Sequence, residues 1–494
     1  MELHPRLLED WPKLIWEASF KPGGHYVNLY HGPLVEITDE WVTEAVWVGG
    51  FEGGDFDLTD LVFGSGVRLR DGQVFFVSSG TAMDRLWHCY HEGHWHVSNS
   101  LPALLAVTDL SLREDYQGYV DDILTINCGR GSLSNHIRKL GTSEGTALNV
   151  LYYNNLVYDG QTLKELPKPD TTPDLKSYKN YRAFLTHTAG ELIANAGSEK
   201  RSFPVFPVST ISAGYDASAV AAIAGQAGCG HTVTISNSTS FWRGSDSGRE
   251  IADCLGLSCE EYRHTPRRYR CEETIWAATG QPRGLNYTVL GFPEPLCLLF
   301  TGNYGEMAWD LGMQDFLDPA SDLSGLCLCE YRLNQGFFHC VPAYWGVRHL
   351  AEIREINRSD EMVPWMMRNH YDRPIPRRIL EEAGVPRKRF GMRKMNTSSD
   401  SVFWWPYSRS HKIKFMEYLK ARGMYGPGPI LSELIRWAAK TENLVYKNIG
   451  KRLGIRQRWR PWTRIHAKDH LFQWANHALK ERYKNELNKC KGCA

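Results

Sequence analysis

The chain has 494 residues and a mass of 56.4 kDa, which at roughly 100 to 200 residues per domain predicts about two to four packing units and excludes a single small module. With 42% hydrophobic and 23% charged residues, the composition is that of a globular protein with a large core, and it excludes global disorder. The 57 Lys and Arg residues balance 56 Asp and Glu residues, so no whole-molecule field attracts nucleic acid or anionic lipid. A charged partner would have to be recognised by a local cluster.

The start of the chain and the cysteines indicate where the protein resides. The first twenty residues carry acids and tryptophans where a signal peptide would have a basic start and an unbroken apolar run. No apolar run approaches the ~20 residues that span a bilayer. Of the twelve cysteines only Cys490 and Cys493 form a CxxC, which resembles an exposed tail because a second pair for zinc is missing. We therefore expect a cytoplasmic protein with reduced thiols and no membrane partner.

In chain order, three units are predicted. Residues 1–170 are β-rich, since short alternating or apolar runs are separated by Gly and Asp turns. The Pro-, Lys- and Asp-rich stretch 164–178 has no apolar period and is typical of an exposed linker. In residues 178–400, a strand-then-helix rhythm over 203–310 predicts a parallel α/β sheet. Residues 401–494 are predicted to form a basic, mainly helical extension.

The most informative segment follows the apolar run at residues 208–211. It reads SAGYDAS, from Ser212 to Ser218, and a helix rich in small residues begins immediately afterwards. Small residues let the backbone approach an anion, the helix N-terminus offers unpaired N–H groups, and the two serine hydroxyls add hydrogen bonds. Asp216 would repel a phosphate unless Mg²⁺ bridged them. The alternative is a tight strand-to-helix turn in which Asp216 only caps the helix.

This loop resembles the SGGxDSS pyrophosphate loop of the asparagine synthetase and β-lactam synthetase family, within the PP-loop superfamily of ATP pyrophosphatases. The following TVTISN segment is similar to the family's second strand, whose edge receives adenine, and it places Ile235 and Ser236 there. Further on, LLFTGNYGEMAWD resembles the family's (S/T)GxGxDE segment, which places Thr301 and Gly302 near the nucleotide. The resemblance implies binding of ATP and Mg²⁺.

The resemblance also implies roles for single residues. Asp216 and Glu306 would hold Mg²⁺, because they follow different strands of one parallel sheet and meet at its carboxyl edge. Gly214 and the two loop serines would cradle the pyrophosphate. The segment VPRKRFGMRKMNT is similar to the family's late lysine segment, so Lys394, with Arg393 beside it, would stabilise charge on an acyl-adenylate. A solvated basic run is the alternative for that segment.

Several residues depart from the family pattern. Ala213 replaces a glycine, Ala217 replaces a serine, and Met307 replaces a glutamate. Glu306 has a longer side chain than the usual aspartate, and Asn303 stands where asparagine synthetases have a catalytic glutamate. We therefore expect phosphate and metal binding. Whether a site with this altered loop is catalytically active stays open, and aspartate is not favoured as the substrate.

The N-terminal unit carries a weaker resemblance. In glutamine-dependent members it is a glutaminase whose nucleophile is an N-terminal cysteine. Here Met1 is followed by Glu2, and the first cysteine is Cys89. The segment DRLWHCYHEGHWHVSNSLPALLAV nevertheless resembles a hairpin and helix of that domain. The fold class that follows is α/β, with a degenerate glutaminase-like (Ntn-type) domain, a parallel-sheet ATP pyrophosphatase domain and a mainly helical C-terminal part.

The same hairpin holds His88, His91, His94 and His96. His94 and His96 would share one face of a strand, and the group could bind a metal ion. The alternative is a solvent-exposed, aromatic-rich hairpin that binds no metal ion.

The C-terminal end is basic and aromatic. Residues 447–491 contain thirteen Lys or Arg and three acids, interleaved with Trp459, Trp462 and Trp474. Such surfaces bind RNA or single-stranded nucleic acid. The alternative is an amphipathic helix that packs its tryptophan side against the synthetase-like domain.

Together these features suggest an ATP- and Mg²⁺-dependent, glutamine-independent ligase that adenylates a small-molecule carboxylate for attack by an amine or ammonia. The alternatives are a PP-loop adenylase that modifies nucleic acid such as tRNA, and a non-catalytic scaffold. The identity of the carboxylate and the amine stays open, as does the oligomeric state, with a homodimer among the alternatives.

Overall fold

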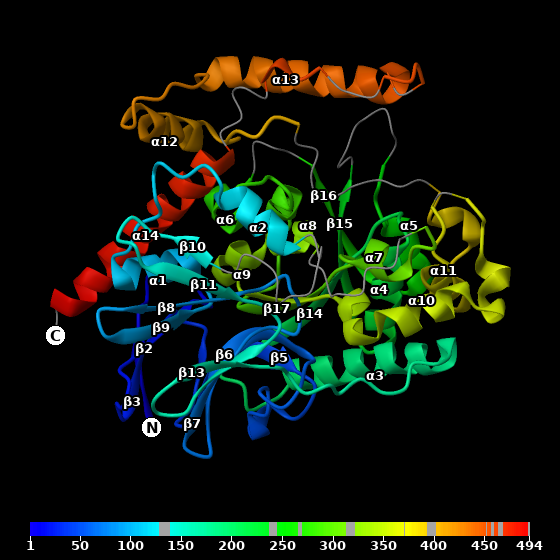
Figure 1. Ribbon diagram of the computed structural model, residues 1–494. Helices are drawn as coiled ribbons and strands as arrows, with labels where there is room; N and C mark the ends of the chain where they lie inside the picture. The colour runs from blue at the N-terminus through cyan, green and yellow to red at the C-terminus, as the bar shows by residue number, and fades with distance from the viewer. Residues whose placement is uncertain are drawn as a thin grey trace.

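The fold is described from a computed structural model (Figure 1). The residues that it describes are 1–127, 139–236, 245–264, 269–312, 322–369, 371–392, 402–450, 452–455, 459–462 and 468–492.

The N-terminal part contains two antiparallel β-rich sheets, as the sequence predicts. The first has the order β1 (Glu2–Leu7), β3 (Tyr26–His31), β2 (Trp16–Phe20), β9 (His94–Ser98), β8 (Leu86–His91), β11 (Ala147–Leu151) and β10 (Lys139–Gly141). The second has the order β13 (Leu163–Leu166), β12 (Asn155–Tyr158), β7 (Gln73–Val77), β6 (Val62–Arg70), β5 (Trp41–Trp47) and β4 (Glu36–Ile37). Neighbouring strands are antiparallel except for β1 and β3.

The two sheets share an apolar core. Val27 and Val97 of the first sheet belong to one buried cluster with Val67 and Phe76 of the second. Alternate residues of each strand point to this cluster, which is how a half-buried strand forms. On the other side, the first sheet contacts α1 (Leu101–Thr108). The neighbouring helix α2 (Tyr119–Asn127) contacts α14 (Lys468–Gly492).

A parallel sheet of five strands forms the centre of the molecule, which confirms the predicted strand-then-helix rhythm. Its order is β16 (Ser258–Arg263), β15 (His231–Ser236), β14 (Val205–Thr210), β17 (Leu296–Phe300) and β18 (Phe337–Cys340). All neighbouring pairs are parallel. Along the chain, β15 and β16 are added on one side of β14, and β17 and β18 are added on its other side. The strand order therefore reverses between β14 and β17. Ligands bind at such a switch point in open α/β sheets.

Helices surround this sheet and form the C-terminal part. Those of the central part are α3 (Tyr178–Ala196), α4 (Asp216–Gln226), α5 (Arg249–Leu255), α6 (Glu272–Thr279), α7 (Gly305–Trp309), α8 (Leu323–Leu326), α9 (Cys329–Gln335), α10 (Leu350–Arg358) and α11 (Pro374–Glu382). The C-terminal part is mostly helical, with α12 (Arg409–Lys420), α13 (Pro429–Val445) and α14. Short 3-10 helices span Phe51–Gly53, Leu285–Val289, Pro342–Tyr344, Val347–His349, Asp360–Trp365 and Arg387–Arg389, and a π-helix spans Tyr446–Gly450.

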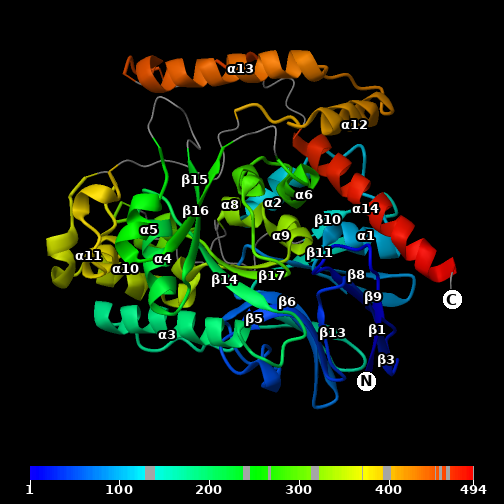
Figure 2. The ribbon, with the colours of Figure 1, turned by 180° about the vertical axis from the view of Figure 1, so that it is seen from behind.

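The C-terminal helices lie in different places. α14 packs against both α1 and α6, and so joins the N-terminal part to the central part (Figure 1). α13 lies at the end of the molecule farthest from the N-terminal sheets, and Figure 2 shows the same arrangement from behind. Among the described residues, none of the helices combines the length and the apolar character that a membrane span needs.

Residues 164–178, the predicted linker, are exposed over most of their length, as their composition predicts, but the segment is also held to the N-terminal part at a few positions. Strand β13 takes up its first residues and pairs with β12. Lys168 and Leu175 are buried, and the Thr171 hydroxyl donates to Asp60 at 2.5 Å. The composition therefore indicates correctly that most of the segment is exposed, but it does not mark the buried positions: Leu175 enters the core, whereas Leu166 stays exposed.

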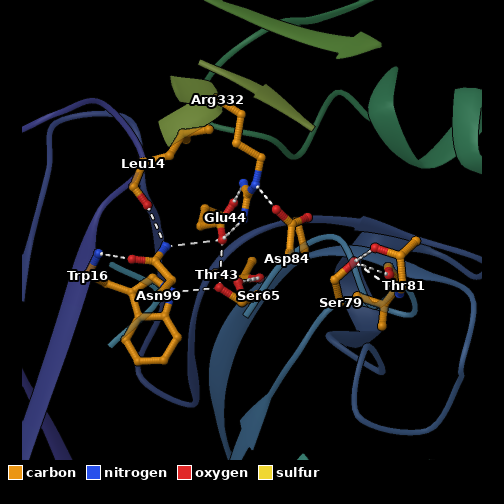
Figure 3. A network of polar contacts seen from close by, with 12 residues as sticks. Leu14, Trp16, Thr43, Glu44, Ser65, Ser79, Thr81, Asp84, Asn99 and Arg332 are labelled. Atoms are coloured by element: carbon orange, nitrogen blue, oxygen red, sulfur yellow. Dashed lines mark hydrogen bonds and ion pairs between the residues drawn. The ribbon is translucent and has the colours of Figure 1, made fainter. Parts of the chain in front are cut away.

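A buried polar network joins α9 to the N-terminal sheets (Figure 3). Arg332 of α9 donates to both oxygens of Glu44 on β5, at 2.6 and 3.0 Å, and to Asp84 at 2.6 Å. Ser65 and Asn99 also donate to Glu44, at 2.6 and 3.1 Å. These charges are removed from water together, so each depends on the others.

Candidate functional site

The site lies where the chain leaves β14 and β17. Val208 of β14 is buried, and the Ile211 amide donates to the Val233 carbonyl at 2.9 Å, so the strand continues to the start of the loop. At Gly302, a Cβ atom would lie 2.3 Å from the Ala217 amide nitrogen. Only glycine therefore lets the loop after β17 pack against the start of α4. The two loops that the sequence singles out are in direct contact.

The loop after β17 has an uncommon backbone. Tyr304 has a φ of 64°, in the left-handed region that non-glycine residues seldom adopt. Its amide donates to the Asp322 carboxylate at 3.2 Å, which holds this conformation. Backbone strain of this kind, about 1–3 kcal/mol, is concentrated at functional sites.

A cavity of about 390 Å³ opens beside these loops. It is lined by Ser212, Gly214, Tyr215, Asp216, Ala217, Arg283, Tyr287, Gly302, Asn303, Tyr304, Gly305, Glu306, Asp322, Leu323, Ser324, Tyr371 and Arg373. It lies at the switch point of the parallel sheet and has the size of a small-molecule site.

Asp216 is paired with a buried arginine. Its Oδ2 atom accepts a hydrogen bond from Arg373, whose Nε atom also lies 3.3 Å from Asp310. Burial lowers the pKa of Arg373 to about 10, so its guanidinium stays charged at neutral pH. The other carboxylate oxygen of Asp216, Oδ1, is buried without a hydrogen-bond partner.

The helix-capping alternative for Asp216 is wrong. The N-cap of α4 is Tyr215, which makes no side-chain cap hydrogen bond, and Asp216 is the first helical residue. Its side chain reaches Arg373 across the cavity wall rather than the amides of its own helix. The N–H groups of the first turn therefore have no side-chain cap, as in helix N-termini that bind anions.

Of the predicted ligand-binding residues that the structure describes, five line the cavity and four do not. Ser212, Gly214, Asp216, Gly302 and Glu306 line the cavity.

The other four predicted residues do not line the cavity. Ser218 is buried and donates to the Ser212 carbonyl, so its hydroxyl is engaged. Thr301 is hydrogen-bonded to His339 at 2.8 Å. Ile235 and Ser236 are the last residues of β15, two strands away from β17.

Three of the departures from the pattern that the sequence resembles line the cavity. They are Ala217, Asn303 and Glu306. The Tyr287 hydroxyl donates to Asn303 Oδ1 at 3.5 Å, while Asn303 Nδ2 is buried without a hydrogen-bond partner. Asn303, which the resemblance aligns with a catalytic glutamate, is thus a neutral amide on the cavity wall. Ala213 contributes instead to the fold of the loop, since its amide donates to the Asp246 carbonyl at 3.1 Å.

Sequence reasoning missed Arg373, Arg283 and Tyr371, and also Asp322. Asp322 caps α8 by accepting from the amides of Ser324 and Gly325, at 2.8 and 3.0 Å, and this cap was readable from the sequence DLSG. No local signal marks Arg373, because its partner Asp216 lies 157 residues away in the chain. Lys394, Arg393 and Cys493 lie outside the described residues.

The hairpin histidines are not gathered as metal ligands. His94 and His96 share a face as predicted, with ring centroids 6.2 Å apart, but His96 is hydrogen-bonded to Glu17 at 2.9 Å. His88 points to the opposite face, and burial lowers its pKa to about 4. In the part of the chain that the structure describes, no group of three or more His, Cys, Asp or Glu residues could hold a metal ion.

The basic C-terminal helix is used for packing. Trp462 and Trp474 are buried, whereas Trp459 is exposed. Lys480 and Lys484 of α14 both pair with Asp109, at 3.1 and 2.6 Å. The packing alternative therefore holds for α14, and nucleic-acid binding by the remainder stays a prediction.

Comparison of the chain with protein-family models finds no matching model, and comparison with curated proteins finds no matching relative. The family resemblance therefore rests on the sequence motifs alone.

Proposed function

We propose that this protein is an ATP- and Mg²⁺-dependent ligase that forms an amide bond through an acyl-adenylate. The observation that carries the proposal is the meeting of the SAGYDAS loop and the TGNYGE loop at one cavity, at the switch point of a parallel sheet. The free amides at the start of α4 suit the pyrophosphate of ATP. Arg373 adds a fixed positive charge at the same wall.

The cavity also suits a magnesium ion. Asp216 keeps one buried carboxylate oxygen without a partner, and Glu306 lines the same cavity. Mg²⁺ is commonly held by one or two carboxylates together with substrate phosphates. Bound there, Mg²⁺ would neutralise charge on the pyrophosphate that leaves.

The proposed reaction has two steps. A carboxylate oxygen of the substrate attacks the α-phosphorus of ATP, an acyl–phosphate bond forms, and the bond to pyrophosphate breaks. The nitrogen of an amine or ammonia then attacks the acyl carbon, AMP leaves, and the nitrogen loses a proton. ATP makes the carboxylate reactive, so this chain's residues contribute mainly positioning and charge. Ser212 and Gly214 would orient the phosphates, and Arg373 would stabilise developing negative charge.

The N-terminal part supports a glutamine-independent enzyme. We propose that its two facing sheets are a degenerate glutaminase-like, Ntn-type scaffold. The first cysteine, Cys89, is fully buried, and burial raises its pKa to about 12. A thiol in that environment stays protonated and is not a nucleophile. Nitrogen would therefore come from ammonia or from an amine on the second substrate.

The test uses the purified full chain with Mg²⁺, ATP labelled at the α-phosphate, and small-molecule extract as the source of the acid. We expect AMP and pyrophosphate from the unmodified protein and at least a hundredfold less from Asp216→Asn. The matched control is Asp310→Asn, which removes another carboxylate partner of Arg373 but does not change the cavity wall. Adenylation is refuted if no extract yields AMP, or if both variants lose the activity equally. Retained ATP binding without AMP in any extract would identify a scaffold.

A further inference from the structure

Helix α13 is held to the rest of the protein through its polar side. Its buried residues are Ser432, Arg436, Ala439 and Asn443, which recur every three or four positions and form one face. Arg436 donates to the backbone carbonyls of Trp405 and Pro406, at 2.7 and 3.1 Å. Its guanidinium also lies 3.6 Å from the ring centroid of Tyr407.

The rotation of α13 about its axis is therefore fixed, and its apolar side points outward. Ile430, Leu434 and Trp437 are 80%, 60% and 70% exposed. Leu431, Leu444 and Val445 are exposed as well. At about 100° per residue, these six positions fall on the side of the helix opposite to the buried polar face. We call these six residues the α13 face.

The usual arrangement of an amphipathic surface helix is thus reversed. Such a helix normally turns its apolar stripe to the core, and a large exposed apolar patch marks an interaction site. Helix α13 lies at the end of the molecule away from the N-terminal sheets (Figures 1 and 2), and the exposure of the six side chains means that the described part of the protein does not cover this face.

Positive charge continues the α13 face along the chain. Residues 443–467 contain seven Lys or Arg and no acid. Of the basic side chains that the structure describes, Lys447, Arg452 and Arg460 are exposed. Ile449 and Leu453, between them, are exposed too. Apolar and basic side chains are therefore presented together.

We propose that the α13 face docks on the surface of an anionic lipid bilayer. Aliphatic side chains with a tryptophan suit the boundary between acyl chains and headgroups, and the neighbouring cations suit anionic headgroups. This differs from the expectation of no membrane partner, because overall charge and hydropathy do not report a local surface. The proposal does not depend on the proposed catalytic function.

Two other occupants fit the surface less well. RNA is bound mainly by aromatic platforms and arginines, whereas five of the six residues of the α13 face are aliphatic. A symmetric dimer through this face would cover the apolar side chains, but residues 443–467 of either copy contain no acid that could pair with the exposed cations of the other.

The experiment measures binding of the full chain to sucrose-loaded vesicles by sedimentation. One set of vesicles contains phosphatidylcholine mixed with phosphatidylglycerol, and the other contains phosphatidylcholine alone. We compare the unmodified protein with Leu434→Asp/Trp437→Asp. The control, Leu7→Asp/Tyr26→Asp, places the same two charges on an exposed leucine and an exposed aromatic residue of β1 and β3, away from α13.

We expect the unmodified protein and the control to sediment with the phosphatidylglycerol vesicles, and the double variant to bind roughly tenfold or more weakly. Both changed side chains are exposed, so unchanged thermal unfolding is expected and is checked. Arg452→Glu is expected to weaken binding to the anionic vesicles alone.

Three results would overturn the proposal. The first is an unmodified protein that stays in the supernatant, or a double variant that binds as well as the control. The second is binding of transfer RNA that the double variant loses, with no binding to vesicles. The third is a dimer of the unmodified protein in light scattering that the double variant converts to monomer, which would make a second copy the occupant.

Discussion

Replacing Arg332 by methionine should expose how strongly the N-terminal sheets and α9 depend on each other. Arg332, Glu44 and Asp84 have side chains that are at most 4% exposed. Burial raises the pKa of Glu44, because the charged carboxylate loses its hydration, while Arg332 acts in the opposite direction. Arg332→Met would leave two carboxylates in a site without water or a compensating cation.

The expected loss is about 3–5 kcal/mol in the free energy of unfolding, the range found when one partner of a buried ion pair is removed. For a cooperative unit of about 150–250 residues, 1 kcal/mol shifts Tm by about 2–4 °C, so Tm should fall by roughly 6–20 °C. The loss should shrink as the pH falls, because protonation of Glu44, whose pKa burial raises, removes one of the two uncompensated negative charges.

The assay is urea and thermal unfolding at neutral pH. Arg387→Met is the control, since Arg387 pairs with Glu381 at the surface and should cost less than about 1 kcal/mol. Arg332→Met/Glu44→Gln/Asp84→Asn should recover much of the loss, because its buried groups are neutral. Equal losses in the two single variants, or a triple variant less stable than Arg332→Met, would show that this reasoning is wrong.

Two further changes test other parts of the structure. Burial alone would lower the pKa of His411, but hydrogen bonds to two α6 carboxylates outweigh it and raise the pKa to about 9. The protonated imidazole therefore stabilises the fold fully below the unfolded pKa of about 6.5, and this stabilisation is lost as the pH rises through 9. His411→Asn should lower the free energy of unfolding most at about pH 6 and least above about pH 10. A loss that grows with pH in urea unfolding would contradict this. At Gly305 a Cβ atom would lie 2.4 Å from Asp216 Cγ, so Gly305→Ala should weaken binding of a fluorescent ATP analogue at least tenfold. The control is Gly190→Ala, which has open space around the added Cβ atom and should leave binding unchanged. Equal binding of the analogue by both variants would contradict the proposed site.

Many of the helices and strands can be predicted from residues that are neighbours in the sequence. The run at Val208 followed by small residues predicts β14, a loop and α4, because an apolar strand, a tight turn and a helix start each depend on neighbouring residues. The same holds for β17, whose five residues are all buried as its sequence LCLLF predicts. The sequence alone therefore predicted the parallel sheet and the two loops that form the candidate site.

Contacts between distant residues were decided only by the tertiary structure. Arg373 meets Asp216 because α11 packs against α4, and nothing beside either residue in the chain records that contact. Likewise, the periodicity of α13 marks an amphipathic helix but not which side faces inward, since the backbone carbonyls that bind Arg436 lie about 30 residues earlier. Hydrophobic period and turn chemistry are short-range signals, whereas buried charge pairs and helix orientation depend on which surfaces the folded chain brings together.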